Sequence, residues 1–427
     1  MLQINGLSHP ARHSIDEGHG SAEFALDFRR CHTKMRAYLD HNATTPVDPA
    51  VLDAMVGFLS SDYGNASSIH TPGQNARAAV NRARDSVADL LGARPAEIIF
   101  TSGGTEADNL AILGAIEASR LPKKHVVSTV IEHPGVLHAC QSLESRGVAV
   151  TYVPVSLNGA VDPEAVRRAL RPETVLISVM HANNETGVIQ PIEEIGRIAA
   201  EFGVLFHTDA VQSAGKVSFD VDRMGVHLLS LSAHKIYGPK GVGVLYVRGG
   251  TRISPQFHGG HHERDLRPGT ENVPGIVGLG KAAELALVHM DSEASAPLRV
   301  SALRDRFENA VLEKIPSAHV NGAGAPRVPG TTNICFDHAG GEALVIALDL
   351  LGIACSTGAA CSSGAVEPSH VLLAMGLSPD EARSSIRFSL GRPTTPEEID
   401  YVIASLPGVV ERLRSLSPRS STPAVTT

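Results

Sequence analysis

Apolar residues follow two different spacings along this chain. From about residue 72, segments with helical spacing are separated by short apolar runs that are typical of buried strands. In Gln74–Leu91 the apolar residues recur every three or four positions, which puts them on one side of a helix. The helices expected on this basis are Gln74–Leu91, Thr105–Ile116, Val277–His289 and Leu298–Ile315.

The short apolar runs predict strands, and helical segments separate most of them. In chain order they are Ile98–Phe100, Val126–Val130, Val148–Val155, Val175–Met180, Val204–Thr208, Leu228–Leu231 and Val242–Val247. Strands that alternate with helices predict a mostly parallel sheet that helices cover on both faces. The expected fold class is therefore α/β.

The pattern changes near residue 292, and the remaining chain predicts a second, smaller α/β domain. Thr331–Phe336, Ile353–Ser356 and Ser385–Ser389 are strand-like, whereas Asn321–Pro329 is rich in Gly and Pro and is typical of a loop. A chain of 427 residues is long enough for two domains. We expect a disordered leader at 1–34, a large domain at 49–291, a small domain at 35–48 and 292–415, and a mobile tail at 416–427.

Composition excludes several classes of protein. The formal net charge is −8, from 37 basic and 45 acidic residues, so no general attraction to nucleic acid or anionic membranes is expected. The longest apolar runs are too short to cross a bilayer. Residues 1–34 lack the apolar stretch of a secretory signal, and they are either a disordered extension or precede a true start at Met35.

The chain has five cysteines, and they are widely scattered. They are Cys31, Cys140, Cys335, Cys355 and Cys361. A sparse, odd-numbered set argues against a framework of disulfides and favours a reducing compartment, the cytoplasm.

A phosphate-binding turn is predicted where the strand at Ile98–Phe100 leads into the next helix. Gly103 and Gly104 allow a ligand to approach the backbone, and Thr105 adds a hydroxyl group. The first N–H groups of a helix are unpaired and attract anions. By itself this turn is equally compatible with an ordinary strand–helix connection.

Three further polar segments follow predicted strands, at the edge of an α/β sheet where ligands bind. Asp209 either caps a helix or holds a proton on a ligand's ring nitrogen. Lys235 lies between an apolar strand and a Gly-Pro turn, so a buried lysine that forms a covalent link to a cofactor is favoured over a surface lysine. The segment 181–187, His-Ala-Asn-Asn-Glu-Thr-Gly, is either a loop that faces a ligand or a turn that uses Asn for positive φ.

Seven motifs occur together and in order: TSGGTEADNLAI, EHPGVL, HANNETGVIQP, FHTDAVQSAGK, SAHKIYGPKGVG, RPGTENV and SSGAVEPSHVL. This set resembles the NifS/IscS-type cysteine desulfurases, which are class V, fold-type-I enzymes that depend on pyridoxal 5′-phosphate (PLP). The resemblance runs from about Tyr38 to Ser417. It implies a homodimer that converts L-cysteine to L-alanine and passes the sulfur to an acceptor protein.

The resemblance also implies a role for each matching residue. Lys235 would carry PLP, and His133 would stack on its ring and assist proton transfer. Arg387 would bind the substrate carboxylate, for which a planar guanidinium is well suited, with Asn184 beside it. The other cofactor contacts implied are Gly104, Thr105, Ser232 and His234 at the phosphate, Asp209 at the ring nitrogen, Asn184 and Gln212 at the phenolic oxygen, and Thr270 at the phosphate of the partner subunit.

Cys361 is the implied sulfur acceptor. It lies in a small, polar, Gly-containing stretch that predicts a mobile loop, and an exposed loop cysteine is unusual unless its thiol is used. Cys140, Cys335 and Cys355 lie in apolar segments and are expected to pack in the core. Some members of the family hold an iron–sulfur cluster transiently on this cysteine, but one cysteine cannot hold a stable cluster, so no metal site is expected.

The chain departs from the family pattern at three positions, Ala359, His262 and Pro268, none of which removes a catalytic group. His258, His261 and His262 invite a metal site, but no recognised ligand spacing accompanies them, and a structural role is favoured.

Two rival functions remain at this point. One is another class V enzyme, such as a selenocysteine lyase or an aminotransferase. The other is a catalytically inactive protein that only binds a sulfur-transfer partner.

Overall fold

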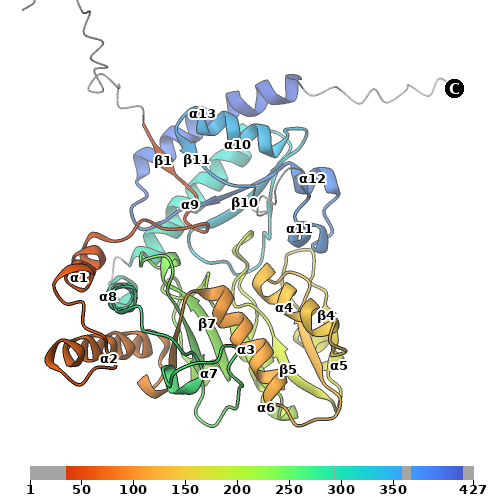
Figure 1. Ribbon diagram of the computed structural model, residues 1–427. Coiled ribbons are helices and arrows are strands. Elements are labelled where there is room, and N and C mark those ends of the chain that lie inside the picture. Colours follow the sequence, from red (N-terminus) through yellow and green to blue (C-terminus); the bar gives the residue numbers. More distant parts are fainter. Residues whose placement is uncertain (1–34, 292–294, 358–366, 417–427) are drawn as a thin grey trace, which may run out of the picture. The chain divides into compact units, whose positions relative to one another are not determined.

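The computed structural model describes residues 35–291, 295–357 and 367–416. These residues form sheets of seven, three and two strands together with the helices (Figure 1). The seven-stranded sheet has the order β2-β8-β7-β6-β5-β3-β4. Its strands are β2 (Ile98–Thr101), β3 (His125–Thr129), β4 (Ala149–Val153), β5 (Thr174–Ser178), β6 (Leu205–Asp209), β7 (Leu228–Ser232) and β8 (Gly243–Val247).

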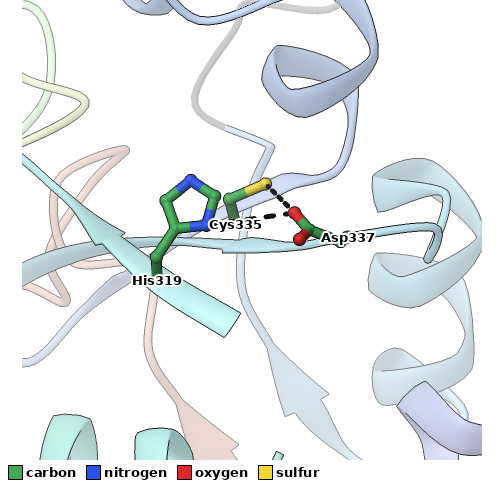
Figure 2. A group of neighbouring side chains, drawn as sticks. All are labelled: His319, Cys335 and Asp337. Atoms are coloured by element: carbon green, nitrogen blue, oxygen red, sulfur yellow. Dashed lines mark hydrogen bonds and ion pairs between the residues drawn. The ribbon is translucent and has the colours of Figure 1, made fainter. Parts of the chain in front are cut away.

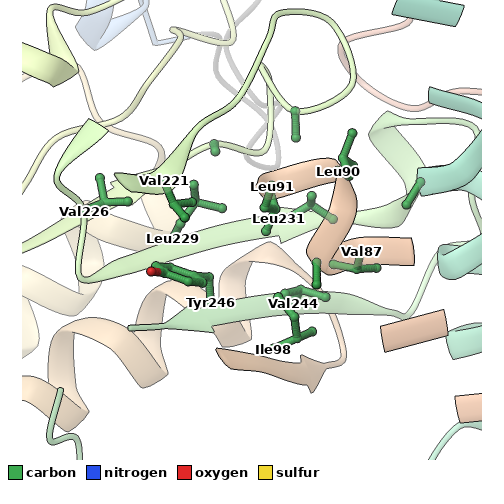
Figure 3. Packing of buried hydrophobic residues seen from close by; sticks show 14 of the residues in the cluster. Val87, Leu90, Leu91, Ile98, Val221, Val226, Leu229, Leu231, Val244 and Tyr246 are labelled. Carbon is green, nitrogen blue, oxygen red and sulfur yellow. The ribbon is translucent and has the colours of Figure 1, made fainter. Parts of the chain in front are cut away.

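Helices cover both faces of this sheet because neighbouring residues of each strand point to opposite sides. Leu176 and Leu228 belong to one apolar cluster, with α3 and α4. Ile177 and Leu229 belong to another, with α2, α6 and α8, and Figure 3 shows part of this second cluster. The helices of this part are α1 (Pro49–Ser60), α2 (Thr71–Leu91), α3 (Gly104–Ala118), α4 (Pro134–Glu144), α5 (Pro163–Ala169), α6 (Ile192–Phe202), α7 (Val221–Met224) and α8 (Val273–Asp291).

Helix α2 illustrates how the sequence sets these boundaries. His70 caps its first turn by accepting a hydrogen bond from the backbone N–H of Gly73, and Pro72 lies in that turn, where a missing N–H costs nothing. Gly92 ends the helix with a φ of 65°, in the left-handed region that glycine adopts without strain. The buried residues between these caps include Ala79, Val80, Ala83, Val87 and Leu90, which follow the helical spacing noted in the sequence.

The two smaller sheets combine β1, near the beginning of the described chain, with strands from its last third. Strands β9 (Ala318–Asn321), β10 (Thr331–Phe336) and β12 (Ser385–Ser389) form an antiparallel sheet, and β1 (Ala37–Tyr38) pairs in parallel with β11 (Ile353–Ala354). Phe388 packs edge to face against Phe307 and Phe336 in their core, with ring centroids 4.9 and 6.5 Å apart. The helices are α9 (Ala296–Lys314), α10 (Gly341–Asp349), α11 (His370–Ala374), α12 (Pro379–Arg383) and α13 (Pro396–Leu416).

The predicted fold class is confirmed, with one refinement. Strand β8 runs antiparallel to both of its neighbours, β2 and β7, while the other paired strands of the large sheet are parallel. Only residues 233–242 join β7 to β8. A parallel crossover needs a dozen or more residues, so this connection is too short to return the chain for a parallel pairing.

The predicted division into two domains stays a prediction. Residues 49–291 supply the two clusters on the large sheet, and residues 35–48 and 295–416 supply the cluster on the small sheets, but a further cluster joins Ile131 and Met180 to α11 and α12. The predicted leader at 1–34 lies outside the described residues, as does the predicted tail beyond Leu416. Among the described helices, α8 is long and apolar enough to cross a membrane, but half of its apolar window is buried in the protein.

Candidate active site

The candidate site lies where β5, β6 and β7 end and the chain continues into polar segments. Asp209 is the last residue of β6, and Ser232 is the last residue of β7. Lys235 follows Ser232 in the short helix η3 (Ala233–Lys235). Parallel strands bring these carboxyl ends to one edge of the sheet, as the sequence predicted for ligand-binding residues.

The Lys235 amine is bound by two backbone carbonyl groups from the beginning of the described chain. Nζ donates hydrogen bonds to the oxygens of Asn42 at 2.6 Å and Ala43 at 2.7 Å. Burial, followed by the positive charge of Arg387, lowers the pKa of Lys235 to about 8. A larger share of this amine is therefore uncharged, and able to act as a nucleophile or a base, than of an ordinary lysine at the same pH.

Asp209 and His133 form the electrostatic centre of the site together with Lys235. Asp209 is buried, and burial raises its pKa; His133, when protonated, and the charge of Lys235 oppose that rise. Burial lowers the pKa of His133, so its imidazole is neutral near pH 7. His133 Nδ1 accepts a hydrogen bond from the backbone N–H of Gly135, at 3.1 Å, so the ring proton of the neutral form lies on Nε2.

The N-terminus of α3 is where the sequence predicted a phosphate-binding turn. Gly103 precedes the helix and offers no side chain to cap it, and Thr105 is exposed in the first turn. Gly104 is needed for close packing, because an added Cβ would lie 2.7 Å from Val211 Cγ2. The N-terminus of α3 therefore lies against Val211, two residues after Asp209, and Ser232 is the next nearest residue to Gly104.

His234, the fourth predicted phosphate contact, is half-buried at this edge. Its Nδ1 lies 3.1 Å from Thr44 Oγ1, and its carbonyl oxygen accepts a hydrogen bond from the backbone N–H of Thr45. Burial, with the charges of Lys235 and Lys240, lowers the pKa of His234 to about 4. A neutral imidazole can still donate one hydrogen bond to an anion.

Arg387 reaches the same region from β12 of the small sheet. Its guanidinium donates to the carbonyl oxygen of Asn184 at 3.0 Å and pairs with Asp40 Oδ1 at 2.8 Å. Arg387 Nε is buried without a hydrogen-bond partner among the described residues. The group therefore has donor capacity left, and it already binds one carboxylate.

Sequence reasoning missed two residues that connect these groups. Asn42 accepts from Lys235 and Gln212 through its carbonyl oxygen and donates through Nδ2 to the carbonyl oxygen of Asn184. Lys216 donates to Gln212 Oε1 at 3.1 Å, and burial lowers its pKa to about 7. The motif HTDAVQSAGK contains Lys216, so its position in that motif could have singled it out, whereas no local signal marked Asn42.

Two buried carboxyl groups near Asp209 were also missed. Asp108, on α3, has an oxygen within 4.8 Å of ligand atoms of both His133 and Asp209, and its Oδ1 has no hydrogen-bond partner among the described residues. Burial, then the charge of Asp209, raises the pKa of Asp108 well above its usual range. Burial raises the pKa of Glu132 to about 8. Burial therefore favours the protonated form of both carboxyl groups.

The segment that carries Thr270, and the short helix before it, are held by ion pairs. Thr270 is exposed, in a segment that Arg267 fastens to α3 through Glu106, with Nε and Oε1 2.9 Å apart. The segment before it, η4 (Glu263–Asp265), has three successive non-glycine residues with positive φ. Arg84 holds it by a bidentate pair with Glu263 at 2.6 and 2.9 Å.

The three histidines beside this segment have ordinary surroundings. His258 is exposed, His261 pairs with Asp265 at 2.6 Å, and His262 Nε2 lies 3.2 Å from Ser67 Oγ. The structural role preferred from the sequence for these histidines stays a prediction.

Three of the five cysteines lie in described residues. Cys140, Cys335 and Cys355 are buried, and burial raises the pKa of each thiol to about 12. A thiol with this pKa is a poor nucleophile at neutral pH. The predicted sulfur acceptor, Cys361, and the unassigned Cys31 lie outside the described residues.

Comparison with known proteins decides the family. The chain matches the family described as aminotransferase class-V over residues 37–402. The chain belongs to this family. Within it, the chain is 52% identical over 388 residues to cysteine desulfurase IscS of Anaeromyxobacter dehalogenans, covering 90% of this chain and 95% of that protein. The resemblance to the NifS/IscS-type desulfurases that the motifs indicated is thereby confirmed.

Solved structures agree with this assignment. A NifS-like protein, 39% identical, superimposes with a TM-score of 0.83 over 89% of this chain and all of that chain. A structure described as SspA in complex with cysteine is 41% identical, with a TM-score of 0.75 over 84% of this chain and all of that chain.

Proposed function

We propose that this protein is a PLP-dependent cysteine desulfurase, which converts L-cysteine to L-alanine and transfers the sulfur to Cys361. One observation carries the proposal. The amine of Lys235, the carboxyl group of Asp209 and the imidazole of His133 interact electrostatically at the edge of the sheet, in a chain whose relatives are cysteine desulfurases.

The side chains at this edge suit each part of PLP. The uncapped terminus of α3, with Thr105, Ser232 and His234, offers hydrogen-bond donors to a phosphate. The Asp209 carboxylate suits a protonated ring nitrogen, and Lys235 supplies the amine for a covalent link. Gly104 lets the N-terminus of α3 pack against Val211, because a Cβ at this position would lie too close to the Val211 side chain. This donor set fits the cofactor.

The side chains of the protein would then act as follows. Arg387 binds the substrate carboxylate through its guanidinium, which requires its bond to Asp40 to loosen. Lys235 Nζ removes the proton from substrate Cα and returns it, for which a pKa near 8 is suitable. When bound, PLP supplies an electron sink for the charge that develops at Cα.

Cys361 would complete the reaction. Its thiolate would attack the sulfur of the substrate and break the Cβ–Sγ bond, which leaves the sulfur on Cys361 as a persulfide. The electron pair of the broken bond stays with the carbon fragment, which takes up a proton at Cβ to become the methyl group of L-alanine. Described residues offer no equivalent thiol, since burial raises the pKa of Cys140, Cys335 and Cys355 to about 12. We further propose a homodimer in which Thr270 contacts the phosphate of the partner subunit's cofactor, a cytoplasmic location, and an acceptor protein that removes the sulfur.

Release of alanine and sulfide from L-cysteine, with added thiol, tests this proposal. Wild type should form both products in equal amounts. The Cys361→Ala variant should keep its yellow cofactor colour and lose sulfide release, whereas the Lys235→Ala variant should lose the covalent cofactor link and both products. Activity of Cys361→Ala equal to wild type would instead indicate a lyase or an aminotransferase, and a protein that stays colourless with PLP would indicate a catalytically inactive binding protein.

A further inference from the structure

A second group of polar side chains lies on the small sheet, away from the candidate active site. His319 lies on β9, Cys335 on β10, and Asp337 just beyond the end of β10 (Figure 2). His319 and Cys335 are direct partners in the antiparallel register, so their side chains share one face of the sheet. Asp337 is two residues after Cys335, which returns its side chain to that same face.

The spacing of the three groups matches that of ligands around one small ion. One ligand atom from each residue lies within 4.8 Å of the other two. Cys335 Sγ is 3.5 Å from Asp337 Oδ1, and His319 Nδ1 is 3.9 Å from the same oxygen. Tetrahedral zinc with ordinary bond lengths separates a sulfur and an oxygen ligand by about 3.6 Å, and a nitrogen and an oxygen ligand by about 3.4 Å. The sulfur–oxygen separation therefore already fits, and a shift of about half an ångström in the His319 ring would bring Nδ1 to the expected distance from Asp337 Oδ1.

Arg414, on α13, fixes the backbone that carries two of these groups. Its guanidinium donates hydrogen bonds to the carbonyl oxygens of Pro316 and Ser317, just before β9, and to that of Asp337. One side chain thus holds both segments in place without contact to the potential ligand atoms. A metal site benefits from such support, because ligands that are already positioned lose little entropy on binding.

We propose that His319, Cys335 and Asp337 form a binding site for one divalent transition-metal ion of the zinc class. Thiolate, imidazole and carboxylate are the ligands that zinc prefers. His319 and Asp337 have side chains that are 45% and 35% exposed, so the ion enters from solvent and water fills the fourth position. The proposal does not depend on the proposed desulfurase activity.

Binding replaces the proton of the Cys335 thiol with the metal ion, so one proton is released for each ion bound. Burial raises the pKa of Cys335 to about 12, the carboxylates of Asp337 and Glu381 contribute to this rise, and a hydrogen bond with Ser385 opposes it. The ion therefore competes with a tightly held proton, and the apparent affinity rises with pH. The ion would join β9 to Cys335 of β10, two positions beyond Asn333, whose side chain donates a hydrogen bond to the carbonyl oxygen of Glu185, the neighbour of Asn184.

Titration of the full-length protein with Co²⁺, followed by competition with Zn²⁺, tests the site. A Cys31→Ser/Cys361→Ser background removes the two thiols that lie outside the described residues. Visible absorption typical of a tetrahedral cobalt–thiolate centre should appear at one ion per chain and disappear when Zn²⁺ is added. The Cys335→Ser variant should lose this absorption, and Cys355→Ser, which removes another buried thiol, should keep it.

His319→Ala is the decisive variant if Cys335→Ser folds poorly, because the half-exposed imidazole can be removed without opening the core. It should weaken binding by more than the roughly 10–100-fold that loss of an outer-shell partner costs, and it should abolish the rise in Tm that Zn²⁺ gives to the parent protein. The proposal is overturned if the parent shows no cobalt–thiolate absorption, or if Cys335→Ser and His319→Ala bind both ions as tightly as the parent.

Discussion

A carboxyl oxygen of Asp108 and one of Asp209 lie within 4.8 Å of each other, and both side chains are buried. Two buried carboxyl groups this close do not readily ionise together, so one proton is held between them near neutral pH. Asp209 interacts favourably with His133 and Lys235, whereas Asp108 has Asp209 and Glu132 as neighbours of like charge. We therefore assign the proton to Asp108 and the negative charge to Asp209.

Substitution of the two aspartates separates these roles. Asn resembles a protonated Asp, so Asp108→Asn should keep cofactor colour and turnover within about threefold of wild type. Asp209→Asn removes the charge proposed to face the ring nitrogen and should lower kcat by about 100-fold or more. Steady-state kinetics with the cofactor absorbance spectrum measure both effects. Equal losses in the two variants would mean that the charge of Asp108 is required.

The lowered pKa of Lys235 predicts how cofactor binding depends on pH. The uncharged amine is the reactive form, and its pKa is about 8, compared with about 10.4 for a free lysine. The rate of PLP uptake by cofactor-free protein should therefore rise with pH through about 8 and level off above it. Stopped-flow absorbance measures this rate.

Asp40→Asn provides the matched control, because the negative charge of Asp40 raises the pKa of Lys235. The midpoint should move to lower pH in this variant. A rate that continues to climb beyond pH 9 in wild type would contradict the lowered pKa.

Arg387→Lys should impair substrate binding more than turnover. Lysine keeps the positive charge but cannot hold Asn184 and a carboxylate at the same time as the guanidinium does. Loss of one charge-assisted hydrogen bond, about 1.5–3 kcal/mol, corresponds to a rise in KM for L-cysteine of roughly ten- to hundredfold. Arg383→Lys, at an exposed arginine paired with Asp380, should leave KM unchanged. An unchanged KM in Arg387→Lys would remove Arg387 from the substrate site.

Alkylation of the native protein should distinguish its cysteines. At pH 8 a thiol with a pKa near 12 is ionised to only about one part in ten thousand, so Cys140, Cys335 and Cys355 should resist iodoacetamide until the protein is unfolded. Peptide mapping by mass spectrometry reads each site separately. Modification of Cys355 as fast as Cys361 would show that the burial of Cys355 does not protect it in solution.

The sequence predicted most elements of the large sheet because their apolar residues repeat with a clear period. It also singled out Asp209 and Lys235, which lie in motifs, and Arg387, which lies in the predicted strand Ser385–Ser389. Asn42 could not be found in this way, since its contact with Lys235 joins residues 193 positions apart. The apolar residues of β8 do not indicate that this strand runs antiparallel to its neighbours. The short connection from β7 could have indicated it.

Asp108 was missed for a different reason. It lies inside a predicted helix, where a single acidic residue is usually solvated, and its burial follows from the packing of α3 on the sheet. The cluster of His319, Cys335 and Asp337 was missed because β9 was not predicted as a strand. Without that strand, the sequence gives no reason to place His319 opposite Cys335.

The contacts of Asn42 also bear on when this part of the chain can fold during its synthesis. The segment that supplies the carbonyl groups to Lys235 is anchored on β12, where the backbone N–H of His41 donates to Ser389 and that of Asn42 to Ser389 Oγ. A chain still on the ribosome can expose Lys235 long before Ser389 has been synthesised. The first described segment therefore cannot make these contacts until one of the last described strands has been synthesised.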